Sequence, residues 1–302
     1  MLALMVGLLL QAGPMPTFAA QVEVVGVTVN AVDPRTGAPV VGLTPQDFNI
    51  FEDGKRQQVT NFLQEDAPAS VIVLLDASFS MEPLIPSIRE AAERLIRSLR
   101  PIDEVQVASF DDAYQVLSNF TMDHDAAARS LKSLVQGKNT SVHLAMYTAT
   151  RLLENRHRKD LDRRRVLIIL SDGENTVSSM TAEAALDEIR RSSVVCYAVH
   201  ITRAYEENPR ARVLAEQAKH FMESVVFETG GRLVSVQHPY SRDDIVGAFN
   251  NISSELGMQY HLAYESIIDP ARTGWRTIGV VMTSRSNVRL RYRRGFYVAL
   301  RR

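Results

Sequence analysis

Cysteine is nearly absent from this sequence: Cys196 is the only one among 302 residues. A lone thiol cannot form a disulfide within the chain, so the fold must depend on its packed core. Cys196 lies in the apolar run from Val194 to Val199, where a free cysteine is usually an inert core residue. We therefore expect no redox or catalytic role for it.

An excess of charge of either sign is also missing, because 34 Lys and Arg residues face 35 Asp and Glu residues. A net charge of -1 creates no field that would attract the chain to nucleic acid or to an anionic membrane. Two arginine-rich segments, 156–165 and 285–294, are local, and we interpret each as a solvated face. The composition thus predicts no nucleic-acid partner.

The sequence has no apolar run long enough to cross a bilayer as a helix. The run Leu2 to Leu10 is short, and Thr17-Phe18-Ala19 is an acceptable cleavage site for a secretory signal. No Lys or Arg precedes Arg35, so the basic start of a typical signal is missing. We expect residues 1–19 to be a signal peptide and expect no transmembrane segment. The expected location is therefore secreted, periplasmic or in the cell envelope. The missing basic residues have two explanations: the start of the sequence is imperfectly assigned, or these residues are a buried N-terminal segment instead of a signal peptide.

Signatures of several enzyme classes are missing as well. No serine lies in a Gly-x-Ser-x-Gly elbow, and no His-x-x-x-His pair is present to hold zinc. No glycine-rich phosphate loop follows the first strand of the expected parallel sheet. Hydrolase, zinc-enzyme and dehydrogenase interpretations therefore lose their main support.

What is present is a chain that can bury a large core, since 45% of its residues are hydrophobic. Residues 67–257 alternate apolar strands with amphipathic helices, which predicts an α/β domain with a mostly parallel, doubly wound sheet. The expected strands are 71–75, 105–110, 114–117, 166–170, 194–200 and 232–236. The expected helices are 84–99, 142–152, 213–227 and 241–256, the last with Ser241 and Asp244 as a capping box.

The two flanking zones read as β structure. In the first, Glu52 to Lys55 indicates a hairpin turn between strands at 48–51 and 58–62. In the second, strands are expected at 259–264, 275–283 and 288–298. Neither flank is long enough to bury the core of a stable domain by itself. We expect residues 20–66 and 258–302 to form one β-sandwich domain, with the α/β domain inserted between them.

Oxygen-bearing side chains follow three segments of the expected parallel sheet. Asp76, Ser78 and Ser80 come directly after the strand 71–75, and Asp172 follows the strand 166–170. Thr140 lies in a polar loop that leads into the helix from Val142. Ligands of open α/β sheets bind outside the carboxyl ends of the strands, and hard oxygen donors suit a magnesium-type cation.

Each segment alone has an ordinary structural explanation. Ser80 would cap a helix beginning at Met81, and Asn139 or Thr140 would cap the helix from Val142. An Asp-Gly turn after a strand, as at Asp172, is common. Capping does not explain the carboxylate of Asp76 at the end of a strand. The three segments together indicate a cation site more specifically than any one of them alone.

The order and types of these residues resemble the metal-ion-dependent adhesion site of von Willebrand factor type A domains. That pattern is D-x-S-x-S, then a threonine, then an aspartate after the fourth-strand region. By this resemblance Ser78, Ser80 and Thr140 would bind Mg²⁺, Mn²⁺ or Ca²⁺ through their hydroxyls. Asp76 and Asp172 would act directly or through water. The family's usual Gly-Gly-Thr is Lys138-Asn139-Thr140 here, and an inward-pointing Lys138 would weaken the site.

The flanks resemble a bacterial subgroup of proteins related to this family. Three segments carry this likeness: Gly42-Leu43 to Glu52-Asp53-Gly54, then Thr229-Gly230-Gly231, and finally Arg293-Arg294-Gly295-Phe296-Tyr297. The resemblance implies a non-enzymatic binding or adhesion module that recognises the Asp or Glu carboxylate of a protein partner through the metal. The ligand-contacting residues would be Phe79, Asn139, Ser141, Gly173 and Glu174.

Other functions remain open from the sequence. A metal-dependent phosphoesterase, or an accessory subunit of an enzyme assembly, would need further carboxylates, for which Asp111, Asp112 and Glu174 are candidates. A structural module with an empty site is a third possibility. We interpret His143 as a solvated or capping residue. By resemblance, the helix 241–256 is a candidate relay that would change the angle between the two domains when the site is occupied.

Overall fold

The central element of the fold is a six-stranded sheet. The computed structural model describes residues 21–64, 67–157, 163–177, 179–202, 209–268 and 273–298. The sheet has the order β10-β9-β8-β5-β6-β7, and all neighbours are parallel except β6 and β7. The strands are β5 (Ala69–Asp76), β6 (Glu104–Phe110), β7 (Tyr114–Thr121), β8 (Arg164–Ser171), β9 (Val195–Thr202) and β10 (Leu233–Gln237).

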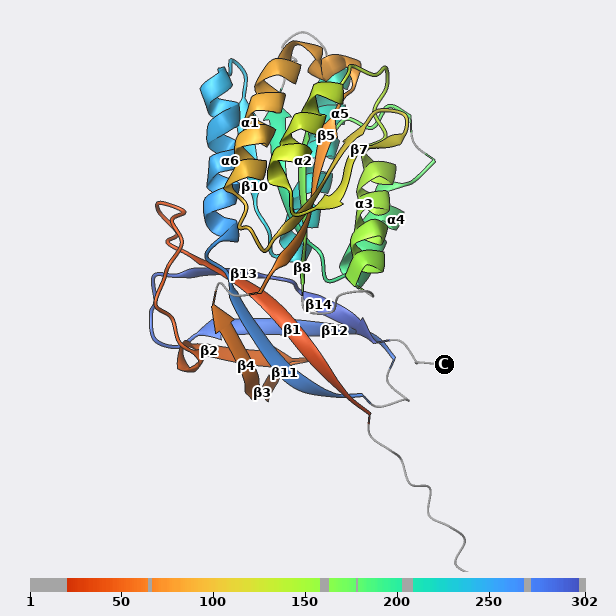
Figure 1. Ribbon diagram of the computed structural model, residues 1–302. Coiled ribbons are helices and arrows are strands. Elements are labelled where there is room, and N and C mark those ends of the chain that lie inside the picture. The colour runs from red at the N-terminus through yellow and green to blue at the C-terminus, as the bar shows by residue number, and fades with distance from the viewer. Residues whose placement is uncertain are drawn as a thin grey trace, which may run out of the picture.

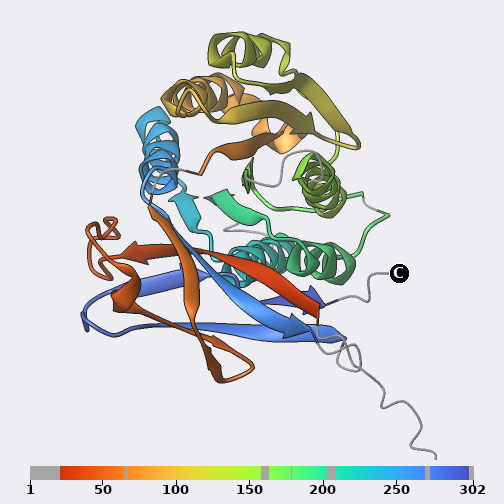
Figure 2. The ribbon, with the colours of Figure 1, turned by 60° about the horizontal axis from the view of Figure 1, so that its bottom comes forward.

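Helices cover both faces of this sheet (Figures 1 and 2). On one face α1, α2 and α6 share a buried core with the sheet, and on the other face α3, α4 and α5 do so. The helices are α1 (Ile85–Ser98), α2 (His124–Ser130), α3 (Val142–His157), α4 (Ala182–Arg191), α5 (Pro209–Thr229) and α6 (Arg242–Leu256). Short 3-10 turns occur at Pro45–Asp47, Phe79–Leu84 and Leu131–Ser133. The predicted α/β class is therefore confirmed.

The flanks form two antiparallel sheets, ordered β13-β1-β11-β4 and β14-β12-β2-β3, which lie together at one end of the α/β part (Figure 1). Each sheet combines strands from both ends of the chain, and the two sheets share one apolar core. The strands are β1 (Gln21–Val32), β2 (Phe48–Glu52), β3 (Lys55–Gln57), β4 (Val59–Gln64), β11 (Tyr260–Ile268), β12 (Gly274–Met282), β13 (Arg289–Tyr292) and β14 (Gly295–Val298).

Two details of the expected β flanks are wrong. The turn at Asp53-Gly54 does form, with positive φ at both residues, but it joins β2 to the short strand β3. The next strand, β4, crosses to the other sheet and pairs with β11. The expected strand 288–298 is likewise split into β13 and β14, which belong to different sheets. Helices α2 and α4 were not expected from the sequence.

The two arginine-rich segments are not simply solvated faces. Arg164 donates to Ala67 O at 2.9 Å and to Gln259 Oε1 at 2.5 Å. Arg293 donates to Ser193 Oγ at 2.6 Å. Burial lowers the guanidinium pKa of both residues to about 10. These arginines are partly buried structural groups at the junction between the α/β part and the flanking sheets.

Candidate functional site

The candidate site lies where β5 and β8 end, side by side. Strand β5 is buried along its whole length and β8 is apolar and buried from Val166 to Leu170, so their carboxyl ends are held in register at one edge of the sheet. Asp76 ends β5, while Ser171 ends β8 and Asp172 follows directly. The parallel pairing therefore brings together two segments that are 95 residues apart in the chain, as the hydrogen bond from Ser171 Oγ to Asp76 Oδ2 shows.

A continuous hydrogen-bonded series joins four of the five predicted metal ligands. Asp76 Oδ1 accepts from the backbone N–H of Ser78 at 2.9 Å. The hydroxyls of Ser78 and Ser80 are 3.0 Å apart, and Ser80 Oγ donates to Asp172 Oδ2 at 2.7 Å. Asp76, Ser78 and Asp172 are at most 1% exposed, whereas Ser80 is only half-buried. Ser80 is thus the member of the series that reaches solvent.

The fifth predicted ligand, Thr140, lies on a loop that backbone hydrogen bonds hold beside the other two loops. Gly137 N donates to Ala77 O at 2.6 Å, next to Asp76. A Cβ atom at Gly137 would lie 2.2 Å from the carboxylate of Asp111, so only glycine fits there. Thr140 O accepts from Thr176 N, and Thr140 N donates to Thr176 Oγ1, both at 2.9 Å. The three loops are therefore bound to one another.

Two buried carboxylates in one site repel each other. Burial, and then the charge of Asp172, raise the pKa of Asp76 to about 7, although hydrogen bonds from Ser171 and Ser78 act in the opposite direction. A cation among these oxygens would offset both the desolvation and the repulsion. The donor set consists of carboxylate and hydroxyl oxygens, which fits Mg²⁺ and similar hard cations.

Further residues support the site from behind. His200, which is buried on β9, contacts Asp172 O through Nε2 at 3.1 Å. Ser171 Oγ accepts from Gly173 N at 2.8 Å. Gly173 has φ +78°, and a Cβ atom there would meet Ala218 of α5 at 3.0 Å. Sequence reasoning missed the supporting roles of Ser171, Thr176 and His200; the position of Ser171 between the apolar strand and Asp172 was the one available signal.

The residues expected to contact a ligand differ in their access to solvent. Phe79 is 66% exposed, and Asn139 and Glu174 are half-buried, so all three present surface beside the site. Gly173 is buried. Ser141 is 4% exposed and its hydroxyl donates to Val177 O, so this hydroxyl already has a partner within the protein. Its place in the loop packing explains the serine.

Lys138 is exposed, so its side chain is not buried among the candidate ligands. The capping explanation for Ser80 is wrong, because the chain turns as a 3-10 helix over Phe79–Leu84 with Ser78 at its N-cap position. Helix α1 begins only at Ile85. Ser80 is therefore inside the turn, with its hydroxyl directed at Asp172.

His143 is packed against neighbouring elements rather than fully solvated. It is half-buried, its ring packs edge-on against Phe221 at 4.5 Å, and Nδ1 contacts Met180 O at 3.3 Å. Burial lowers its pKa. Cys196 is a free buried thiol whose pKa burial raises to about 12, which confirms the expected core role.

The carboxylates proposed for a catalytic alternative are less closely placed. Asp111 Oδ1 accepts from Ala113 N at 3.1 Å and from Gln115 Nε2 at 3.3 Å, so it stabilises its own turn. Asp112 is exposed. Within the described ranges, no group of three or more His, Cys, Asp or Glu side chains is placed to hold a metal. The candidate site differs from such a group, because three of its five proposed ligands are Ser and Thr hydroxyls.

Comparison with known proteins agrees with this architecture. Residues 71–174 match the family model of the von Willebrand factor type A domain. No curated protein matches the chain. The part of the chain that the structure describes has no helix long and apolar enough to span a membrane.

Solved structures show the same fold at low sequence identity. A von Willebrand factor type A protein from Catenulispora acidiphila is 11% identical, with a TM-score of 0.51, over 81% of this chain and 71% of that one. The pilus adhesin SpaC from Lactobacillus rhamnosus GG is 12% identical, with a TM-score of 0.51, over 88% and 48%. Proximal thread matrix protein 1 from the mussel byssus is 12% identical, with a TM-score of 0.50, over 69% and 51%. The α/β part of this chain therefore has the type A fold.

Proposed function

We propose that this chain is a protein-binding module that depends on a divalent cation held by Asp76, Ser78, Ser80, Thr140 and Asp172. The observation that carries the proposal is the hydrogen-bonded series from Asp76 through Ser78 and Ser80 to Asp172, at the carboxyl ends of β5 and β8. Helix capping does not account for two carboxylates at this position, whereas a bound cation would. Burial, and then the charge of Asp172, raise the pKa of Asp76, and a bound cation would offset both effects.

Three neutral hydroxyls and two carboxylates leave a bound Mg²⁺, Mn²⁺ or Ca²⁺ electron-poor, so it would attract a further anionic oxygen. The Asp or Glu carboxylate of a partner protein supplies that oxygen in our proposal. Phe79, 66% exposed, lies next to Ser78 and Ser80 in sequence and would add apolar contact. Asn139 and Glu174 would contact the partner at the rim. The fold similarity to a pilus adhesin supports an adhesive role.

We also propose a domain division and a location. Residues 67–257 would be the type A domain, inserted in a β-sandwich of residues 20–66 and 258–302. The separate apolar cores of the two parts support this division. Residues 1–19 would be a signal peptide that directs the chain to the cell envelope or outside it; they lie outside the described residues.

A capture experiment tests the function. Immobilised wild-type protein is exposed to envelope proteins of its source with Mg²⁺, and in parallel with a chelator. We expect partners to be retained only with Mg²⁺ and only by proteins with an intact site, so Asp172→Ala should lose them while Asp112→Ala keeps them. Identical capture with metal, with chelator and by Asp172→Ala would contradict the proposal.

The alternative is a metal-dependent phosphoesterase. The proximity of Asp111 to the Thr140 loop is the observation that favours it, since Ser141 N donates to Asp111 O at 2.9 Å. Turnover of generic phosphoesters with Mg²⁺, abolished by Asp76→Ala and reduced by Asp111→Asn, would replace the binding function with this one.

A further inference from the structure

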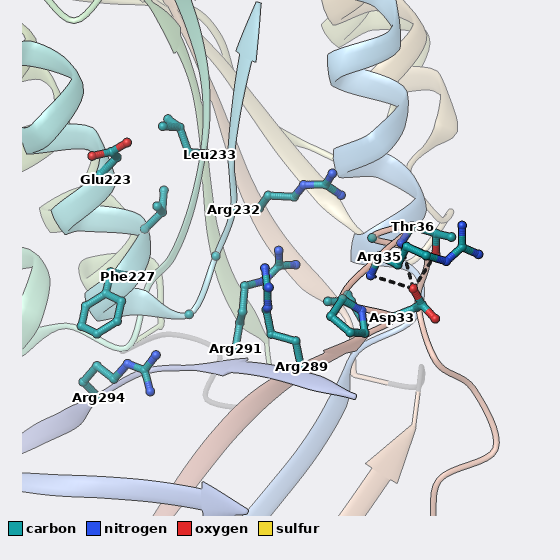
Figure 3. Close-up of a pocket in the computed structure, with 16 residues that line it drawn as sticks. Asp33, Arg35, Thr36, Glu223, Phe227, Arg232, Leu233, Arg289, Arg291 and Arg294 are labelled. Atoms are coloured by element: carbon teal, nitrogen blue, oxygen red, sulfur yellow. Dashed lines mark hydrogen bonds between the residues drawn. The ribbon is translucent and has the colours of Figure 1, made fainter. Parts of the chain in front are cut away.

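A second hollow lies away from the cation site, at the junction of the α/β part and the flanking sheets. Its volume is about 490 Å³. Three separated segments line it: the turn after β1, the connection from α5 to β10, and β13 with the residues that follow it. Figure 3 shows Arg35, Arg232, Arg289 and Arg291 arranged around the hollow, with Arg294 beside Phe227. Five arginines thus meet in one pocket.

The pocket is rigidly built from two sequence motifs that the cation site does not use. In Thr229-Gly230-Gly231, a Cβ atom at Gly230 would lie 2.4 Å from the backbone of Tyr292 on β13. Asn30 of β1 donates to Gly230 O at 2.9 Å, and Arg294 N donates to Glu228 O at 3.0 Å. The C-terminal arginine motif is therefore locked against the end of α5.

Acidic groups near the pocket are already engaged. Glu255 of α6 pairs with Arg291 and, at 3.7 Å, with Arg232. Asp33 Oδ1 accepts from the N–H groups of Arg35 and Thr36 and from the Thr36 hydroxyl, as the dashed lines in Figure 3 show. Glu223 pairs with Lys219 at 3.6 Å. These acidic groups are thus already engaged: Glu255 with two of the pocket arginines, and Asp33 and Glu223 within their own segments.

Three of the arginines keep their charge available. In the described ranges of the chain, Arg35, Arg289 and Arg294 make no ion pair. The guanidinium of Arg294 stacks on Phe227 at 4.3 Å and on Tyr292 at 4.8 Å, which orients it without neutralising it. The pocket therefore carries more positive than negative charge, although the whole chain has a net charge of -1.

We propose that this pocket binds a phosphate group carried by a small organic ligand. A guanidinium presents planar, paired donors that match phosphate oxygens, and several converging guanidiniums are the usual arrangement for that anion. A volume of about 490 Å³ is in the range of ligand pockets, roughly 300–1,000 Å³. Val226, Phe227 and Leu233 add an apolar wall for the remainder of the ligand. The phosphate belongs either to a soluble compound or to a lipid headgroup.

Phosphate binding to the arginine-lined pocket is measured by calorimetry in metal-free buffer, where the candidate cation site holds no ion. Pyrophosphate is the soluble probe, and flotation with phosphatidic acid vesicles, compared with phosphatidylcholine vesicles, is the lipid probe. The wild type should bind one or both, and Arg35→Gln/Arg289→Gln should weaken that binding by about tenfold or more. Binding of pyrophosphate alone assigns a soluble ligand, and binding of vesicles as well assigns a headgroup.

Three controls make the result specific. Arg285→Gln removes an exposed arginine that does not line the pocket, and it should bind as the wild type does. Arg289→Lys keeps the charge but loses the paired donors, and it should bind more weakly than the wild type. Asp172→Ala should leave phosphate binding unchanged, which separates this site from the proposed function. No binding of either probe, or equal binding by Arg35→Gln/Arg289→Gln, would overturn the proposal.

Discussion

At the scale of single residues, the pattern of strand ends predicted that Asp76 and Asp172 would lie close together. Asp76 and Asp172 each follow an apolar strand, and parallel strands end at a common edge, so the sequence could predict that they meet. The supporting role of Thr176 was not predictable, and the only signal for that of Ser171 was its position before Asp172. Both roles arise only when β8 lies beside β5 and when the Thr140 loop lies on the Asp172 loop.

The role of Ser171 gives a stability prediction. Its hydroxyl donates to Asp76 Oδ2 and accepts from Gly173 N at 2.8 Å, and the residue is 0% exposed. Ser171→Ala leaves both partners buried without that hydroxyl, so it should lower the free energy of unfolding by about 1–3 kcal/mol. Urea unfolding measures the loss, with the exposed Ser133→Ala as the control. Equal stability of the two variants would disprove the buried hydroxyl bridge.

At the scale of elements, sequence signals were most reliable where they are local. The capping box at the start of α6 was predicted from Ser241 and Asp244 and is present in the structure. The strand exchange after β3 and the break between β13 and β14 were not predictable. In both, short segments of similar β character pair in different sheets, and only tertiary packing decides which.

The cap of α6 can be tested against a serine in the same helix. Ser241→Ala removes the acceptor for Asp244 N, so it should lower the free energy of unfolding by about 1 kcal/mol. Ser254 is exposed within α6, where alanine is a better helix former. Ser254→Ala should therefore be neutral or slightly stabilising in the same thermal unfolding series. A loss of similar size for both variants would show that the cap contributes nothing specific.

At the scale of the whole molecule, the two parts of the chain have separate cores but a polar junction. The cores of the α/β part contain only residues between Ala69 and Leu256, and the flanking sheets bury their own set. The junction is a buried network in which Gln259 donates to Asn30 Oδ1 at 2.9 Å and to the Tyr197 hydroxyl at 2.6 Å. Helix α6, which the family resemblance makes a candidate relay, leads directly into this network.

The separate cores predict that residues 67–257 fold alone. Exposing the polar junction to water costs less than exposing an apolar core, so the fragment should be soluble and unfold in one cooperative transition. Circular dichroism and a urea titration of the fragment measure this. An aggregated fragment, or one without a cooperative transition, would show that the flanking sheets are needed for its folding.

The junction also predicts a pH dependence of stability. Burial, and then the charges of Arg164 and Arg100, lower the pKa of His261 to about 3. Below about pH 6.5, His261 is protonated in the unfolded chain but not in the native protein. The free energy of unfolding is therefore highest above pH 6.5 and falls as the pH is lowered toward 3. Between pH 7.5 and 4.5 the loss is about 2–3 kcal/mol. His261→Gln should lose correspondingly less stability over that range, and identical pH profiles for both proteins would contradict the effect.

The most direct test of the central claim is calorimetric titration of the purified protein with Mg²⁺ and with Mn²⁺. The claim is that Asp76, Ser78, Ser80, Thr140 and Asp172 hold one cation. Wild-type protein and Asp112→Ala, which changes an exposed carboxylate nearby, should each bind one ion. Ser78→Ala and Asp172→Ala should fold but bind none. Cation binding that survives in Asp172→Ala, or is absent from the wild type, would contradict the site.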